Sequence, residues 1–323
     1  MFPIVQYRDE FKVLLNKYKK ITVLSHINPD PDAIGTALGV YIWLKEQKFH
    51  VEIANITEDI PRSLDFLPSF SKIKKRIDFE DSLIIACDCG SIDRLGFQLD
   101  GREIINIDHH ATNSYFATLN IIDPEAVSSS EVAYHLLKDI YPISKESAVA
   151  FYVALASDTR NFTTNNMHQG IFNLASELTS IGVDIVEVSQ KMLHRRSLAS
   201  LRILGVAINS LELKCDAKIA VLKISQENLK QTGAKYSDLD GVVDYAKSLA
   251  TVEIALMLVE RKKDIKVSIR SKTIDISKLA THFGGGGHNV AGGFEVSNTD
   301  LDGLSDIIVN YIQKGGLLHE TKI

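Results

Sequence analysis

The sequence predicts an α/β fold in two domains: a mainly parallel sheet in the N-terminal part, a smaller mixed α/β domain in the C-terminal part, and a cleft between them. Three observations predict it. Short apolar runs alternate with helical periodicity through the first part of the chain. The later strand candidates are rich in β-branched residues and, with three predicted helices, indicate a smaller mixed α/β unit. The length of 323 residues suits about two domains.

The N-terminal elements follow one another in regular alternation. A first helix is expected over 7–19, and a second carries apolar residues at helical spacing from Ile34 to Leu44. Strands are expected over 21–24, 51–54, 82–87 and 103–107. The third of these is apolar almost throughout, as a strand buried on both faces should be. Further helices are predicted over 129–140, 145–157, 167–181 and 184–193.

The C-terminal elements begin after a helix predicted over 195–212. Strands are expected over 218–224, 251–259 and 266–270, and helices over 237–248, 275–282 and 301–313. We therefore place the N-terminal domain at 1–194, a helical linker at 195–212 and the C-terminal domain at 213–323. Glycines gather in the last domain, over 284–287 and 292–293.

Composition excludes several classes of protein. The 36 Lys and Arg against 41 Asp and Glu give a net charge of −5, which argues against a protein that grips long duplex nucleic acid. The odd number of cysteines argues against a disulfide framework, and Cys87 and Cys89 are expected to be buried thiols facing away from Asp88. No apolar run approaches the roughly 20 residues of a membrane span, and no signal-peptide pattern is present, so a cytoplasmic location without membrane contact is expected.

Acidic residues and histidines recur where the predicted N-terminal strands end. The candidates are His26, Asp30, Asp32, Asp88, Asp108, His109, His110 and, at the end of a helical run, Asp158. Because ligands bind at the carboxyl ends of parallel strands, we expect these side chains to meet at one edge of the sheet. Carboxylate and imidazole ligands together suit Mn²⁺, and two divalent ions would balance four carboxylates that otherwise raise one another's pKa.

These motifs, in this order, resemble the four motifs of the DHH phosphoesterase superfamily. The run from 283 to 294 resembles the glycine-rich motif of the DHH-associated C-terminal domain. The resemblance extends over roughly 21–294, and the layout is similar to the nanoRNase/pAp phosphatase branch. It implies hydrolysis of short oligoribonucleotides to mononucleotides and of 3′-phosphoadenosine 5′-phosphate (pAp) to AMP. It also implies two divalent ions, expected to be Mn²⁺, and a homodimer.

The resemblance also implies roles for single residues. One ion would be held by His26, Asp30 and Asp88, and the second by Asp32, Asp88, His109 and Asp158, with Asp88 bridging. His110 would lie beside the scissile phosphate, and Asp108 would orient a histidine. Thr36 stands where the family commonly has Ser and Gly292 where it commonly has Ala. Neither is expected to touch a proposed ligand.

Chemistry and substrate choice follow from this arrangement. Two ions about 3.5–4 Å apart can lower the pKa of a shared water from 15.7 toward about 7. His110 can either stabilise the developing charge or protonate the leaving group. In the C-terminal domain, Arg270 is the candidate cation for a terminal phosphate, with Arg94 a second candidate on the other domain. The backbone N–H groups of Gly285, Gly286 and Gly287 are candidates for binding phosphate, and His288 is a candidate either to stack on a base or to donate to a phosphate. The expected partners are short single-stranded RNA or small nucleotides.

Other functions stay open at this point. A phosphodiesterase for cyclic dinucleotides or linear pApA needs the same ions, so the site residues cannot separate it from the first hypothesis. A pyrophosphatase or exopolyphosphatase is disfavoured, because its substrates have no base for the glycine-rich motif to recognise. A non-catalytic nucleotide sensor is expected to have lost a ligand, whereas all six candidate ligands are present.

Overall fold

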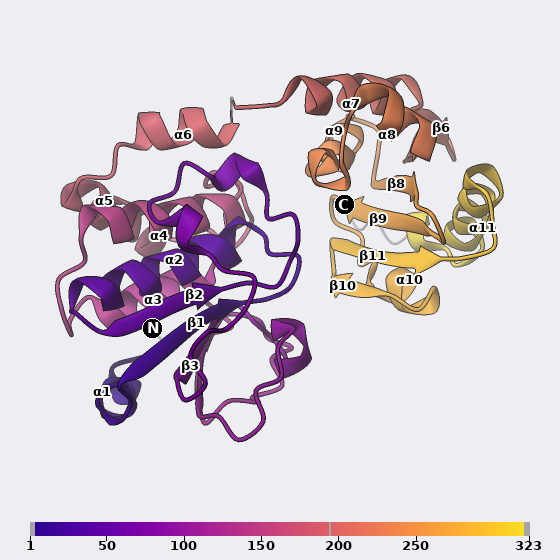
Figure 1. Cartoon of the computed structure of the whole chain (residues 1–323). Helices are drawn as coiled ribbons and strands as arrows, with labels where there is room; N and C mark the ends of the chain where they lie inside the picture. Colours follow the sequence, from indigo (N-terminus) through magenta and orange to yellow (C-terminus); the bar gives the residue numbers. More distant parts are fainter. Residues whose placement is uncertain (1–3, 194, 320–323) are drawn as a thin grey trace. The chain divides into compact units, whose positions relative to one another are not determined.

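The computed structural model describes residues 4–193 and 195–319. The chain divides between Arg195 and Arg196 into two compact units (Figure 1). Within the described residues, none of the helices has both the length and the apolar character needed to cross a membrane. The cleft expected between the domains stays a prediction.

The first unit is built on a five-stranded sheet in which every strand pair is parallel. The strand order is β2-β1-β3-β4-β5. Its strands are β1 (Lys20–Ser25), β2 (His50–Ala54), β3 (Leu83–Cys87), β4 (Ile104–Asp108) and β5 (Leu119–Ile122). The predicted fold class is confirmed, whereas β5 was not predicted, because four residues that include Asn120 form no clear apolar run. The order places the carboxyl ends of β1, β3 and β4 side by side.

Helices cover one face of this sheet. They are α1 (Arg8–Lys17), α2 (Pro31–Glu46), α3 (Ser129–Leu137), α4 (Lys145–Asp158), α5 (Gln169–Ile181) and α6 (Ile185–Leu193). Helices α2 and α4 approach closely: a Cβ on Gly35 would lie 2.6 Å from the Ala150 carbonyl oxygen, and one on Gly39 would lie 2.4 Å from the Phe151 ring. This close packing fixes the start of α2 and the end of α4, which both carry candidate ligands.

A smaller apolar layer covers the other face of the sheet, and it includes Leu24, Ile84, Cys89 and Leu95. Cys87 belongs instead to the helix-covered core. Both thiols are buried as predicted, but they do not share a face. The reason is Asp88 between them, whose left-handed φ of +56° breaks the alternation of side chains along β3.

The second unit is built on a six-stranded mixed sheet with the order β10-β11-β9-β8-β7-β6. Its strands are β6 (Glu212–Lys214), β7 (Ile219–Ile224), β8 (Ile254–Glu260), β9 (Ile265–Ser271), β10 (Gly286–His288) and β11 (Ala291–Val296). Strands β7 and β8 are parallel, and the other neighbours are antiparallel. This confirms the predicted mixed α/β domain.

Helices lie on both faces of the second sheet. They are α7 (Leu198–Asn209), α8 (Gln226–Thr232), α9 (Val242–Lys247), α10 (Ser277–His282) and α11 (Leu301–Lys314). One core contains buried residues of α7, α8 and α9, and the other contains residues of α10 and α11. The segment predicted as a linker, 195–212, contains α7, whose Ile203 and Ala207 are buried in the core of the second unit.

The glycine cluster forms an antiparallel hairpin of β10 and β11, and neither strand was predicted. A Cβ on Gly285 would lie 2.1 Å from the Gly293 carbonyl oxygen. Gly287 has a φ of +142°, and its Cβ would lie 2.4 Å from the Ala291 carbonyl oxygen. Backbone packing therefore requires glycine at these two positions. At Gly286 a Cβ would meet nothing within 4 Å.

Candidate metal centre

The carboxyl edge of the first sheet brings together the candidate ligands from four separate segments. Each of these residues offers one nitrogen or oxygen atom, and within each group these atoms lie within 4.8 Å of one another. One group is His26, Asp30 and Asp88; another is Asp32, His109 and Asp158. A third group is Asp88, His109 and His110. All six candidate ligands therefore lie at one edge of the sheet, and Asp88 groups with His26 and with His109 but is not part of the group that holds Asp32 and Asp158. The assignment of these residues to two ions stays a prediction.

The first group lies where β1 ends and α2 begins. The Nε2 atom of His26 is 3.4 Å from Oδ2 of Asp88 and 3.9 Å from Oδ1 of Asp30. Asp30 is the N-cap of α2, and its Oδ1 accepts a hydrogen bond from the Ala33 N–H at 2.9 Å. His26 and Asp88 are buried, whereas the Asp30 side chain is half exposed, which leaves this group open to solvent on one side.

The second group joins the first turn of α2, the residue after β4 and the last residue of α4. The Nε2 atom of His109 is 3.4 Å from Oδ2 of Asp158 and 3.8 Å from Oδ2 of Asp32. It is also 3.7 Å from Oδ1 of Asp88. Asp88 therefore offers one oxygen to each group. Its left-handed backbone, unusual for a residue other than glycine, directs the carboxylate into this shared position.

The hydrogen bonds of both histidines fit a bound cation. Nδ1 of His26 lies 2.8 Å from the Ile27 carbonyl oxygen, and Nδ1 of His109 lies 3.2 Å from the Ala126 carbonyl oxygen. Each Nδ1–H thus donates to the backbone, and Nε2 presents a lone pair to the carboxylates. Lone pairs that face carboxylate oxygens need a cation or a proton between them. Oxygen and imidazole donors without thiolates suit a divalent ion such as Mn²⁺.

Electrostatics indicate that the cluster is unfavourable without positive charge. Burial, together with the charges of Asp158 and Asp88, raises the pKa of Asp32 well above its usual value. Burial and the charges of Asp30 and Asp88 raise the pKa of Asp158 in the same way. Burial also favours a higher pKa for Asp88. Without an ion, a protonated His26 donates a hydrogen bond to Asp88, and this bond and the charges of His109 and His110 outweigh burial, so that the pKa of Asp88 is lowered. Bound cations would stabilise the carboxylates of this edge.

Asp108 and His110 form a pair beside the two groups. Nδ1 of His110 lies 2.7 Å from Oδ1 of Asp108, and the Asn113 amide donates to Oδ2 of Asp108 at 2.5 Å. The hydrogen bond with Asp108 raises the pKa of His110 to about 9. Asp108 is buried and orients His110, whose Nε2 lies on the side of the ring away from this hydrogen bond.

Arg94 lies next to the first group. Its Nη2 is 3.2 Å from Nδ1 of His26, and its carbonyl oxygen accepts from the Ile27 N–H. When the Nδ1–H of His26 donates to the backbone, the guanidinium cannot donate to the same nitrogen. Arg94 then presents an exposed cation at the edge of the cluster.

The other predicted substrate residues belong to the second unit. Arg270 on β9 pairs with Ala291, and Gly286 pairs with Gly293, so that Arg270, Gly286 and position 288 share one face of the sheet. The side chain of His288 lies outside the described part of the chain. Gly292 points to the opposite face, where a Cβ would lie 3.0 Å from Ile276 and 3.2 Å from Ala280.

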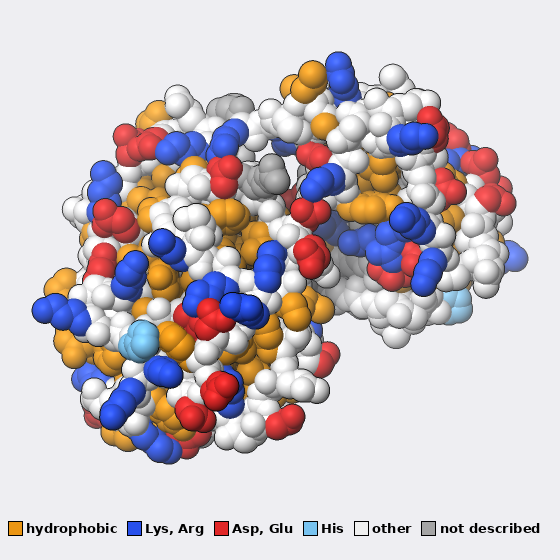
Figure 2. Space-filling view, in the orientation of Figure 1, with side chains coloured by type: hydrophobic (Ala, Val, Ile, Leu, Met, Phe, Trp, Pro, Cys, Tyr) orange, Lys and Arg blue, Asp and Glu red, His pale blue; other side chains and the backbone are white. Residues whose placement is uncertain are grey.

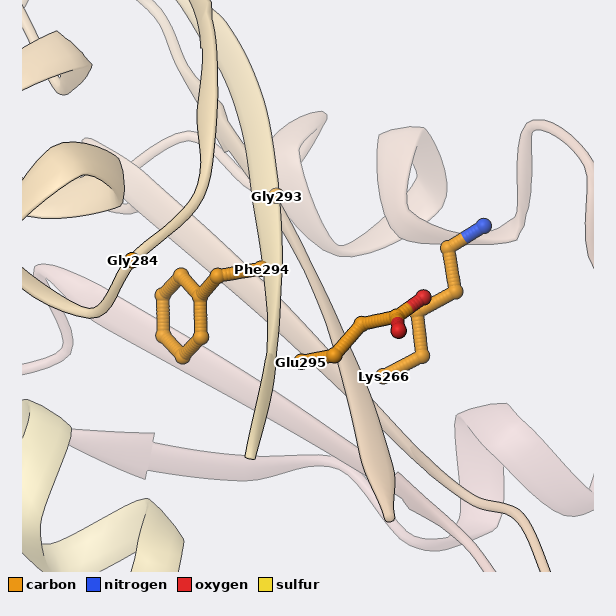
Figure 3. A pocket seen from close by; sticks show the side chains of 5 residues that line it. All are labelled: Lys266, Gly284, Gly293, Phe294 and Glu295. Carbon is orange, nitrogen blue, oxygen red and sulfur yellow. The ribbon is translucent and has the colours of Figure 1, made fainter. Parts of the chain in front are cut away.

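A pocket of about 450 Å³ adjoins this hairpin, lined by Lys266, Gly284, Gly293, Phe294 and Glu295 (Figure 3). Figure 3 shows Phe294 and Glu295 pointing to opposite sides of β11, with Lys266 beside Glu295. Arg270 and the three predicted glycines do not line this pocket. The pocket and the predicted substrate residues therefore adjoin the same hairpin, but none of the predicted residues lines the pocket.

Two residues near the ligands were not expected to act there. Thr36 was predicted to touch no ligand, which is wrong: its Oγ1 donates to Oδ1 of Asp32 at 2.9 Å, because the two residues lie one turn apart on α2. Ser129 was not considered, yet its hydroxyl donates to Asp88 and its N–H to Asp32. The pattern Ser128-x-x-Glu131, which marks a helix start at this edge, was the available signal.

Comparison with known proteins agrees with these motifs. The model of the DHH family, N-terminal domain, matches residues 20–156, and that of the DHHA1 domain matches residues 203–314. The chain is 27% identical over 322 residues to the bifunctional oligoribonuclease and PAP phosphatase NrnA of Thermus thermophilus, covering 97% of this chain and 96% of that protein. It is 26% identical to the protein of the same name from Bacillus subtilis, covering 88% and 92%.

A solved structure extends the similarity to the whole fold. The crystal structure of an exopolyphosphatase-related protein from Bacteroides fragilis is 27% identical, with a TM-score of 0.88, and the match covers 96% of this chain and 97% of that one. Both domain models, nearly full-length relatives and the assembled motifs agree. The chain therefore contains a DHH domain followed by a DHHA1 domain, the pair that its motifs predict.

Proposed function

We propose that this protein is a divalent-metal-dependent phosphoesterase that hydrolyses short oligoribonucleotides to mononucleotides and pAp to AMP, with Mn²⁺ as its ion. One observation carries the proposal: His26 and His109 each present Nε2 to a group of carboxylates. Asp88 links the two groups, because one of its oxygens faces His26 and the other faces His109. The names of the relatives from T. thermophilus and B. subtilis support the substrate class.

Bound divalent ions would neutralise the carboxylates and lower the pKa of an attacking water. The residues of the chain supply the rest. His26 and His109 are held in one orientation by backbone carbonyls, so the ligand positions exist before any ion arrives. His110, fixed by Asp108, can donate from Nε2 to the leaving ribose oxygen. The exposed guanidinium of Arg94 can contact a nonbridging phosphate oxygen.

The distribution of charge supports a small substrate. Figure 2 shows acidic and basic side chains interspersed on the visible face of each unit, rather than a continuous basic field. Proteins that hold long duplexes neutralise many phosphates with Lys and Arg, whereas this chain carries a net charge of −5. Arg94 and Arg270 provide enough cations for one or two phosphates. We propose a homodimer as well, which size-exclusion chromatography with light scattering tests directly.

The test is hydrolysis by the metal-stripped protein after addition of Mn²⁺, Mg²⁺ or EDTA. The substrates are an end-labelled diribonucleotide, pAp, a cyclic dinucleotide and a 24-nucleotide RNA. We expect mononucleotide and AMP from the first two, with Mn²⁺ giving the highest rate and EDTA abolishing it. Asp88→Asn keeps the size of the side chain and tolerates its left-handed backbone, so it should fold and lose activity.

Each other outcome has a definite meaning. Absence of ion-dependent release from both small substrates refutes the proposal. Faster cleavage of the cyclic dinucleotide than of the diribonucleotide refutes the proposed substrate class but leaves the metal centre in place. Equal activity in Asp88→Asn refutes the assignment of the shared carboxylate.

A further inference from the structure

We infer that Ser129 is a positioning residue that sets the second of the two ion positions, the one formed by Asp32, His109, Asp158 and the shared Asp88. The inference rests on the proposed metal centre. It concerns a side chain that is not one of the ligands, and it predicts an effect on one ion position and not on the other.

Ser129 lies at the start of α3, directly beneath the cluster. Its hydroxyl donates to Oδ1 of Asp88 at 2.8 Å, and its backbone N–H donates to Oδ2 of Asp32 at 2.8 Å. The hydroxyl is also 3.4 Å from Oδ1 of Asp108, a longer contact that competes poorly for its single proton. Ser129 is fully buried, so water cannot replace these donors.

Both oxygens that Ser129 contacts face the second group. Oδ1 of Asp88 is the atom 3.7 Å from Nε2 of His109, and Oδ2 of Asp32 is 3.8 Å from the same nitrogen. Oδ2 of Asp88, which faces His26 at 3.4 Å, has no hydrogen bond to Ser129 among the described contacts. Ser129 therefore holds Oδ1 of Asp88, the oxygen that faces the second group, and so fixes the rotation of the Asp88 carboxylate.

Without the hydroxyl, the carboxylate of Asp88 is restrained on one side only. An ion in the first group would still hold Oδ2 together with His26, but Oδ1 can rotate away from His109, because the donor that fixed it is gone. The N–H to Asp32 remains, since it belongs to the backbone. Loss of an outer hydrogen bond of this kind typically costs 10–100-fold in metal affinity. The loss should fall on the second position.

The neighbouring Ser130 offers a matched control. It lies in the same helical turn and is equally buried, and its hydroxyl contacts Ser128 at 2.7 Å instead of a carboxylate. Ser130→Ala thus removes a buried hydroxyl from the same place without touching the cluster. Ser129→Thr keeps the hydroxyl and serves as the rescue variant.

The experiment titrates metal-stripped full-length protein with Mn²⁺ and measures free Mn²⁺ by its electron paramagnetic resonance signal. Wild type should bind two equivalents of Mn²⁺, and Ser130→Ala should bind both equivalents with the same affinities as wild type. In Ser129→Ala, one equivalent should keep its affinity and the other should weaken by about 10–100-fold. Activity should fall at low Mn²⁺ and return at high Mn²⁺, so that the Mn²⁺ requirement changes and kcat does not. Ser129→Thr should restore the second equivalent.

The outcomes separate this inference from the proposed function. If wild type binds no Mn²⁺, the proposed metal centre fails. If wild type binds two equivalents and Ser129→Ala matches Ser130→Ala, or loses both equivalents alike, the role of Ser129 is refuted. Circular dichroism checks folding. Should Ser129→Ala not fold, a folded Ser129→Thr that loses the second equivalent refutes the inference, and one that keeps it supports the inference.

Discussion

Alanine substitutions at two neighbouring glycines of the β10–β11 hairpin, Gly286 and Gly287, are predicted to change the stability of the second unit in opposite directions. Gly286 has open space around the position of a Cβ, and its φ lies outside the left-handed region. Alanine there should stabilise the folded protein by about 0.4–1 kcal/mol, because it restricts the unfolded chain. Gly287 has a φ of +142° and no room for a Cβ. Alanine there should cost more than about 1 kcal/mol from the backbone conformation alone.

The assay is urea unfolding followed by substrate kinetics. With a slope of about 2 kcal/mol per M, Gly286→Ala should raise the urea midpoint of the second unit by roughly 0.2–0.5 M, and Gly287→Ala should lower it by more. If the exposed face of Gly286 receives the nucleotide, the added methyl group should raise KM for a diribonucleotide about tenfold, since one excess methyl group in a packed contact typically costs 1–3 kcal/mol. A lowered midpoint in Gly286→Ala refutes the structural reasoning, and an unchanged KM refutes the contact with substrate.

Three further predictions concern the metal centre. Thr36→Val removes the hydroxyl that donates to buried Asp32, and it should weaken Mn²⁺ binding about 10–100-fold in calorimetry. Thr36→Ser keeps the hydroxyl and should bind Mn²⁺ as wild type does. Equal binding by wild type and both variants would contradict the role of this hydrogen bond. EDTA should lower the thermal midpoint of the first unit alone, because all candidate ligands lie between residues 26 and 158. Mn²⁺ at 100 times its Kd would stabilise that unit by about 2.7 kcal/mol per site. An equal shift of both units in calorimetric scans would contradict a metal centre confined to the first unit. Asp108→Asn should lower kcat and leave Mn²⁺ affinity unchanged, because Asp108 is hydrogen-bonded to His110 and to no candidate ligand. If Mn²⁺ affinity falls together with kcat, Asp108 belongs among the ligands.

The sequence predicts the first unit well because its signals are local. Apolar runs mark β1 and β3, and the polar residues directly after them must lie at the carboxyl edge once the strands are parallel. The same reasoning brings His26, Asp88 and His109 to one edge without knowledge of their distances. It fails for β5, which is held in the sheet by pairing with β4 rather than by an apolar pattern of its own.

The parts that the sequence did not predict depend on contacts between distant segments. The glycine-rich strands β10 and β11 carry no strand pattern, and their pairing with β9 defines them. Ser129 and Asp32 are 97 positions apart, so nothing local joins them. Thr36 is the exception, because its spacing of four from Asp32 on a predicted helix already places the two side chains on the same helix face.

The left-handed backbone of Asp88, which directly follows β3, links the candidate metal centre to the interior of the sheet. Cys87 enters the apolar layer beneath the helices and Cys89 enters the layer on the other side, while the carboxylate between them faces the candidate ions. Ion loading should therefore stiffen the middle of the sheet from both sides at once. Amide hydrogens of β3 and of its partners β1 and β4 are expected to exchange more slowly with deuterium in the presence of Mn²⁺, although none of these strand interiors touches a candidate ligand position.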